Sequence, residues 1–177
     1  MHLSAWIPGA FLALVAGWID VRSHKIPNWL TVSGFVLGLV TSAALTGREG
    51  AESSLLGAAL ALVLLLPAVL LRGLGAGDWK LMGALGACLG PWRVTMVLLM
   101  SAVVAGMMAV VQVIRENRVK ETAINTMTLL HGIFIFGARP SSPISLDSPG
   151  ALALPFGVAV AIATPLGFWA SQMLRSF

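Results

Sequence analysis

The chain has 177 residues, a net charge of +4, 58% hydrophobic residues and only 10% charged residues. Soluble domains carry about 25% charged residues, so this composition excludes a soluble globular domain, and it equally excludes a disordered or collagen-like chain. We expect one integral membrane domain over residues 1–177. The basic residues form no run, so the net charge gives no support to nucleic-acid binding.

The apolar stretches predict an all-α, polytopic bundle of about six transmembrane helices. In chain order, the expected spans are residues 3–19, 30–47, 53–71, 79–89, 94–114 and 151–174. The fourth span is short, and Gly90-Pro91 after it predicts a tight turn into the fifth. Because no basic region precedes residues 3–19, we expect this stretch to remain as the first helix rather than to be removed as a signal peptide.

Residues 115–150 are expected to form a cytoplasmic or interfacial loop region. Within them, residues 122–138 are apolar but contain Asn125 and His131. An interfacial or re-entrant piece is the favoured interpretation, and a seventh span remains open.

The basic residues predict how the chain is oriented in the membrane. One side, with the loop after the first span, receives eight of them: Arg22, Lys25, Arg72, Lys80, Arg115, Arg118, Lys120 and Arg139. The other side receives three, which are Arg48, Arg93 and Arg175. The excess places the loop after the first span in the cytoplasm and, with six spans, both termini outside.

The chain has one cysteine and three scattered histidines. We therefore expect no disulfide within the chain, no four-cysteine zinc site and no metal or other cofactor. Cys88 lies in an apolar stretch, which favours a packing role over a nucleophilic one.

Two acidic residues lie at the edges of expected spans. Asp20 directly follows the first span and Asp78 directly precedes the fourth, so two spans separate them and both lie on the cytoplasmic face. At a helix C-terminus the macrodipole disfavours a negative charge by about 0.3–1 kcal/mol. Taken singly, Asp20 could form an ion pair with Arg22 or Lys25, and Asp78 could be an ordinary N-cap. The two aspartates together favour a functional interpretation.

Two carboxyl groups brought close together can share one proton. One then acts as a base on a water molecule, while the other, protonated, polarises a scissile carbonyl. This chemistry needs neither a separate nucleophile nor a metal.

Both aspartates lie within motif-like sequence. Residues 20–28 read D-V-R-S-H-K-I-P-N, and residues 75–81 read G-A-G-D-W-K-L. Gly75 and Gly77 permit unusual backbone angles and the close approach of another backbone, as an extended peptide substrate requires. A lone G-x-G-D is a weak signal, but D-x-R-x-x-x-I-P-N after the first span combined with G-x-G-D-x-K-L after the third is a strong one.

With these motifs the chain resembles the type IV prepilin peptidases, a family of intramembrane aspartyl proteases of the G-x-G-D type. The resemblance covers residues 18–91, and Leu154-Pro155-Phe156-Gly157 matches a proline-aromatic-glycine motif before the family's last helix. The small size is similar to the tight-adherence (Flp) pilus branch or to archaeal preflagellin peptidases. The resemblance implies that Asp20 and Asp78 are the catalytic dyad of an aspartic endopeptidase. It also implies an inner (plasma) membrane enzyme that cuts the short basic leader of a type IV (Flp-like) prepilin on the cytoplasmic side.

The larger bacterial members carry a cytoplasmic insert with a four-cysteine zinc site, and many also methylate the new N-terminus. Because this chain has one cysteine, we expect a peptidase without methyltransferase activity. Weaker supporting roles fall to Arg22, Lys25, Pro27, Asn28, Gly75, Gly77, Lys80, Pro155 and Gly157. The three basic residues would orient the dyad or meet an acidic group on the substrate, although the positive-inside rule also explains them. Pro27-Asn28 would shape the start of the second helix with Asn28 as its N-cap, and Pro155 would open or break the last helix.

Two other classes of protein compete with the peptidase. A small transporter or channel could use Asp20 and Asp78 as ion- or proton-binding groups, but such residues more often lie mid-span in proteins with two comparable halves. A non-catalytic membrane subunit would have no need for two aspartates on one side within such motifs. The expected partners are the lipid bilayer and a prepilin-like substrate.

Overall fold

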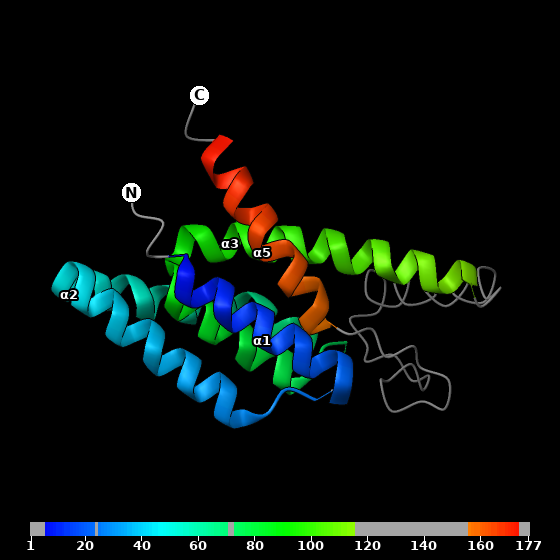
Figure 1. Cartoon of the computed structure of the whole chain (residues 1–177), viewed down its shortest axis with the longest axis horizontal. Coiled ribbons are helices and arrows are strands. Elements are labelled where there is room, and N and C mark those ends of the chain that lie inside the picture. Colours follow the sequence, from blue (N-terminus) through cyan, green and yellow to red (C-terminus); the bar gives the residue numbers. More distant parts are fainter. Residues whose placement is uncertain (1–5, 24, 71–72, 116–155, 174–177) are drawn as a thin grey trace, which may run out of the picture. The chain divides into compact units, whose positions relative to one another are not determined.

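The computed structural model describes residues 6–23, 25–70, 73–115 and 156–173. These residues form four helices, α1 (Ile7–Ser23), α2 (Asn28–Leu70), α3 (Ala76–Arg115) and α5 (Phe156–Met173), and contain no strand (Figure 1). The expected all-α class is confirmed. Residues 116–155, including the expected loop region and the stretch 122–138, lie outside the described residues.

Helices α2 and α3 are each bent at a glycine. In α2 the backbone leaves the helical region at Thr46 and Gly47, and in α3 it does so at Gly90, which has a φ of 75°. Gly90 precedes Pro91, so the expected break between the fourth and fifth apolar stretches is confirmed. Each long helix therefore consists of two helical segments that run in different directions (Figure 1).

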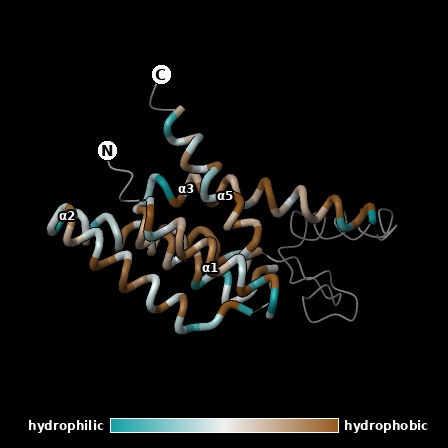
Figure 2. The backbone as a smooth tube through the Cα atoms, in the orientation of Figure 1, coloured by the Kyte–Doolittle hydropathy of each residue, from teal (hydrophilic) through white to brown (hydrophobic). Residues whose placement is uncertain are grey.

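Among the described residues, three helices are long and apolar enough to cross a membrane, namely α2, α3 and α5. This finding supports a membrane protein, while the expected number of about six spans stays a prediction. Hydrophobic residues run along most of each helix, and strongly hydrophilic residues occupy short stretches (Figure 2).

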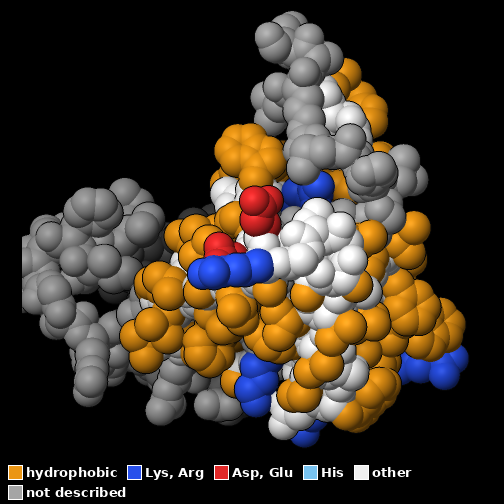
Figure 3. Space-filling model, turned by 90° about the vertical axis from the view of Figure 1, so that its left-hand side faces the viewer, with side chains coloured by type: hydrophobic (Ala, Val, Ile, Leu, Met, Phe, Trp, Pro, Cys, Tyr) orange, Lys and Arg blue, Asp and Glu red, His pale blue; other side chains and the backbone are white. Residues whose placement is uncertain are grey.

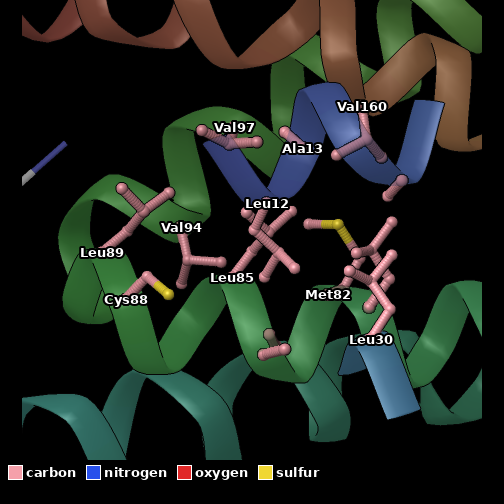
Figure 4. Close-up of a cluster of buried hydrophobic side chains, with 14 of the residues drawn as sticks. Leu12, Ala13, Leu30, Met82, Leu85, Cys88, Leu89, Val94, Val97 and Val160 are labelled. Atoms are coloured by element: carbon pink, nitrogen blue, oxygen red, sulfur yellow. The ribbon is translucent and has the colours of Figure 1, made fainter. Parts of the chain in front are cut away.

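Helices α1, α2 and α5 and residues 76–105 of α3 belong to one compact unit, which holds all the contacts described below. Its central element is the first segment of α3, in which every residue from Leu81 to Gly90 is buried. Leu12 and Ala13 of α1, and Val160 of α5, complete the hydrophobic core around this segment (Figure 4). Fourteen residues at about 1.5 Å each give Ala76–Leu89 a length of roughly 21 Å, which is shorter than a typical hydrocarbon core. Other helices enclose this short segment.

Glycines bring the helices of this unit close together. A Cβ on Gly57 would collide with the carbonyl oxygen of Gly86, and one on Gly86 would collide with that of Gly57, so the backbones of α2 and α3 touch there. Gly38 likewise packs against the backbone of Cys88, and Gly34 packs against the side chain of Leu12. Small residues at crossings are the usual way in which helices approach closely in lipid.

The surface of the unit is apolar, as lipid exposure requires. In Figure 3 hydrophobic side chains cover most of the visible face, acidic and basic side chains gather near its centre, and further basic side chains lie apart below and to the right. Arg48 and Glu52, just beyond the bend in α2, form an exposed ion pair of 2.8 Å between Nε and Oε1.

Candidate functional site

The candidate site lies at the end of the bundle where α1 finishes and α2, α3 and α5 begin (Figure 1). Of the acidic residues that the structure describes, two are at this end, Asp20 and Asp78. Glu49 and Glu52 follow the bend of α2, which is eighteen residues after Asn28 and therefore roughly 27 Å along the first segment.

Asp20 belongs to the last turn of α1, which continues to Ser23, whereas the sequence placed it directly after the first helix. Its side chain is only 5% exposed. The carboxyl oxygen Oδ2 accepts a hydrogen bond of 2.8 Å from the backbone N–H of Gly157, in the first turn of α5. The positive end of the α5 dipole therefore faces this carboxyl and offsets the unfavourable C-terminal end of α1. In the described part of the chain Asp20 forms no ion pair with Arg22 or Lys25.

Asp78 is the third residue of α3, so it lies in the first turn of the helix and does not precede it as an N-cap. The side chain is half-buried. Asp78 lies close enough to Asp20 for the two carboxyl groups to interact electrostatically. The structure therefore brings together the two aspartates that the sequence places 58 positions apart.

The two glycines of the G-x-G-D motif contact different groups. A Cβ on Gly75 would lie 3.1 Å from Oδ2 of Asp78, and the Gly75 carbonyl accepts the N–H of Trp79 at 3.1 Å. Gly77 lies against Ile26, whose Cβ and carbonyl oxygen would each be 3.4 Å from an added Cβ. The segment between α1 and α2 therefore packs directly on the turn that carries Asp78.

A hydrogen bond joins the two motifs a second time. Lys80 Nζ donates to Oδ1 of Asn28 at 3.0 Å, and both side chains are exposed. Asn28 is the first residue of α2, and its side chain binds Lys80 where the sequence predicted an N-cap. Pro27 precedes it, and its carbonyl accepts the N–H of Leu30 at 3.1 Å, which starts the helix.

Within the described residues, Arg22 and Lys25 form no ion pair with either aspartate. The guanidinium of Arg22 lies 4.6 Å from the centre of the Trp18 ring on the same helix. The Lys25 side chain is exposed, and its carbonyl accepts a hydrogen bond from Ser23. Pro155 lies outside the described residues.

Two contacts were not identified from the sequence. Trp79 Nε1 donates to the carbonyl oxygen of Leu62 at 2.8 Å, which ties the first turn of α3 to α2. Gly17, one turn before Asp20, faces Ala161 and the carbonyl of Gly157. The sequence offered one signal for the second contact, which is that the small residue Gly17 lies one turn before Asp20. Such spacings are common in membrane helices, so this signal is weak.

At this end of the bundle one buried and one half-buried carboxyl group interact electrostatically. No group of three or more histidine, cysteine, aspartate or glutamate side chains gathers as a metal site within the described ranges. The arrangement is a membrane helix bundle with a paired-carboxyl site at one end.

Comparison with known families identifies the scaffold. The model of the type IV leader peptidase family matches residues 7–110, which include both aspartates, and the chain belongs to this family. It is accordingly a leader peptidase-like protease built on membrane-spanning helices. No curated protein and no solved structure matches the chain at a significant level.

Proposed function

We propose that the chain is an aspartic endopeptidase in which Asp20 and Asp78 form the catalytic dyad. The observation that supports this proposal is that both aspartates lie at the end of the bundle where α1 finishes and α3 and α5 begin, in a chain whose family is one of peptidases. Asp20 is held by the Gly157 N–H of α5, which is distant in sequence. Asp78 lies in the first turn of its own helix, α3, where Gly77 packs against Ile26 from the segment before α2.

In the proposed reaction one carboxylate removes a proton from water, and the resulting hydroxide attacks the scissile carbonyl carbon. The other carboxyl, protonated, donates a hydrogen bond to the carbonyl oxygen as negative charge develops on it. Breakdown of the tetrahedral intermediate breaks the C–N bond, and the amine leaves with a proton returned by the dyad. Both carboxyl groups are regenerated, so no covalent intermediate with the protein forms.

The proposed substrate is a prepilin-like protein with a short basic leader, cut on the cytoplasmic side of the inner membrane. The sequence resemblance and the family support the substrate class. The excess of basic residues on the side of the loop after the first span supports the orientation.

A Lys25→Cys variant tests on which side of the membrane this loop lies, because the native Cys88 is buried. Labelling of residue 25 by a membrane-impermeant thiol reagent in inside-out vesicles but not in intact cells is the expected result, and the reverse would contradict the orientation.

The dyad is tested by co-expressing a candidate prepilin with the wild type, Asp20→Asn or Asp78→Asn. Asparagine keeps the size and polarity of aspartate but cannot share or transfer the proton. Glu49→Gln is the matched control, because it neutralises an exposed acidic residue beyond the bend of α2. We expect cleavage by the wild type and the control, and none by either aspartate variant when expressed to the same level. Near wild-type cleavage by either aspartate variant would refute the two-aspartate mechanism. An unprocessed panel of prepilins would favour the transporter alternative.

A further inference from the structure

Helix α5 lies directly against one member of the proposed dyad. The Gly157 N–H donates to Oδ2 of Asp20 across a sequence separation of 137 residues. Both residues are buried. This donor is one of the first N–H groups of a helix, which have no partner within the helix itself. The Asp20 carboxyl therefore fills an otherwise open position at the start of α5, and this bond fixes the rotation of the carboxyl group.

The same glycine is also sterically matched to Asp20. A Cβ at position 157 would lie 2.9 Å from both Cβ and Oδ2 of Asp20 and 3.1 Å from its Cγ. Ordinary contacts between carbon atoms are about 3.5–4.0 Å, so a methyl group could fit only if the carboxyl moved. The backbone of Gly157 is not in the left-handed region, so an alanine could adopt the same φ without strain. Position 157 therefore requires glycine because a side chain would collide with Asp20, and not because of its backbone conformation.

A second glycine allows this approach from the other helix. A Cβ on Gly17 would lie 2.7 Å from Cβ of Ala161 and 3.2 Å from the carbonyl oxygen of Gly157. Gly17 is one turn before Asp20 on α1, as Ala161 is one turn after Gly157 on α5. Glycine at position 17 thus lets the two backbones come close enough for the Gly157 N–H to reach the carboxyl.

We propose that Gly157 is a positioning residue for the reaction, and that Gly17 sets the separation of α1 and α5 on which it depends. Gly157 orients Asp20 through its backbone N–H and through the space that its missing side chain leaves. This inference rests on the proposed function, because it gives α5 a part in the chemistry through Asp20. It assigns no substrate contact to Gly157.

The first test measures steady-state cleavage of a prepilin by the purified full-length protein in detergent. Gly157→Ala should lower kcat by about 10- to 100-fold with KM nearly unchanged, since a misplacement of about 1 Å at a reacting group has effects of this size. Gly167→Ala is the matched control, because its Cβ would crowd Val97 of α3 at 3.1 Å instead of Asp20. A general packing defect would affect both variants alike, whereas positioning predicts a loss of kcat in Gly157→Ala alone. Equal kcat losses, or a kcat for folded Gly157→Ala within about twofold of the wild type, would overturn the proposal.

The role of helix separation has its own rescue experiment. Gly17→Ala should also lower kcat, because its methyl group meets that of Ala161. Adding Ala161→Gly removes that methyl group and should recover much of the lost kcat. Absence of any recovery in the folded double variant would contradict the role of Gly17.

A third measurement does not depend on cleavage. In the full-length protein the Gly157 amide should exchange its hydrogen about tenfold or more faster in Asp20→Ala than in the wild type, because the carboxyl oxygen that accepts its hydrogen bond is lost. Amides in the middle of α5 should keep their rates. Unchanged exchange at Gly157 would refute the positioning bond. An inert Asp20→Asn with a fully active Gly157→Ala would refute this inference alone, whereas an active Asp20→Asn would refute the proposed function.

Discussion

Trp79 connects the turn that carries Asp78 to the second segment of α2. Its indole N–H donates to the Leu62 carbonyl at 2.8 Å, and its ring helps to line a cavity of about 250 Å³ together with Phe35 and Gly83. Trp79→Phe removes the donor but keeps an aromatic ring in place. The net loss for one such hydrogen bond is about 1 kcal/mol, which changes the unfolding equilibrium about fivefold. Because Asp78 is the preceding residue, the same loss could lower kcat by at most about fivefold.

The assay is unfolding of the purified protein in mixed micelles with increasing SDS, followed by circular dichroism. Trp29→Phe is the matched control, because Trp29 lies at the start of α2 and is 65% exposed. Substitution of an exposed residue should change the free energy of unfolding by less than about 0.5 kcal/mol. Equal transition midpoints for the two variants would refute the idea that the Trp79 hydrogen bond stabilises the first turn of α3.

Two further predictions concern the contacts around the dyad and the cysteine. A double-mutant cycle of Lys80→Met and Asn28→Ala should give a coupling of about 0.2–1 kcal/mol in the same unfolding assay, because exposed polar pairs contribute little; additive effects would show that the 3.0 Å bond contributes nothing. Cys88→Ala should retain the wild-type kcat and lose about 1 kcal/mol of stability through the small cavity it leaves. Loss of cleavage by folded Cys88→Ala would contradict an aspartate-only mechanism.

The sequence by itself determined the class of protein and singled out the two aspartates as candidate site residues. A chain with so few charged residues can cover its surface only if that surface faces lipid. The break at Gly90-Pro91 follows from the backbone preferences of glycine and proline. The pairing of Asp20 with Asp78 was also within reach, because an even number of spans between two residues returns the chain to the same face. Local signals placed each aspartate a few residues off, outside its helix, since helix ends are the least certain part of a sequence-based assignment.

Tertiary structure decided how the site is held together. The Gly157–Asp20 bond joins positions 137 apart, and the Lys80–Asn28 bond joins positions 52 apart. Hydrophobicity along the chain does not record which helix faces lie against each other, because lipid-facing and buried residues are equally apolar in a membrane. For the same reason the fourth apolar stretch gave no sign that it is buried on every side. Its place, and with it the position of Asp78, depends on glycines that let neighbouring helices approach, and that fit exists only once the helices have packed.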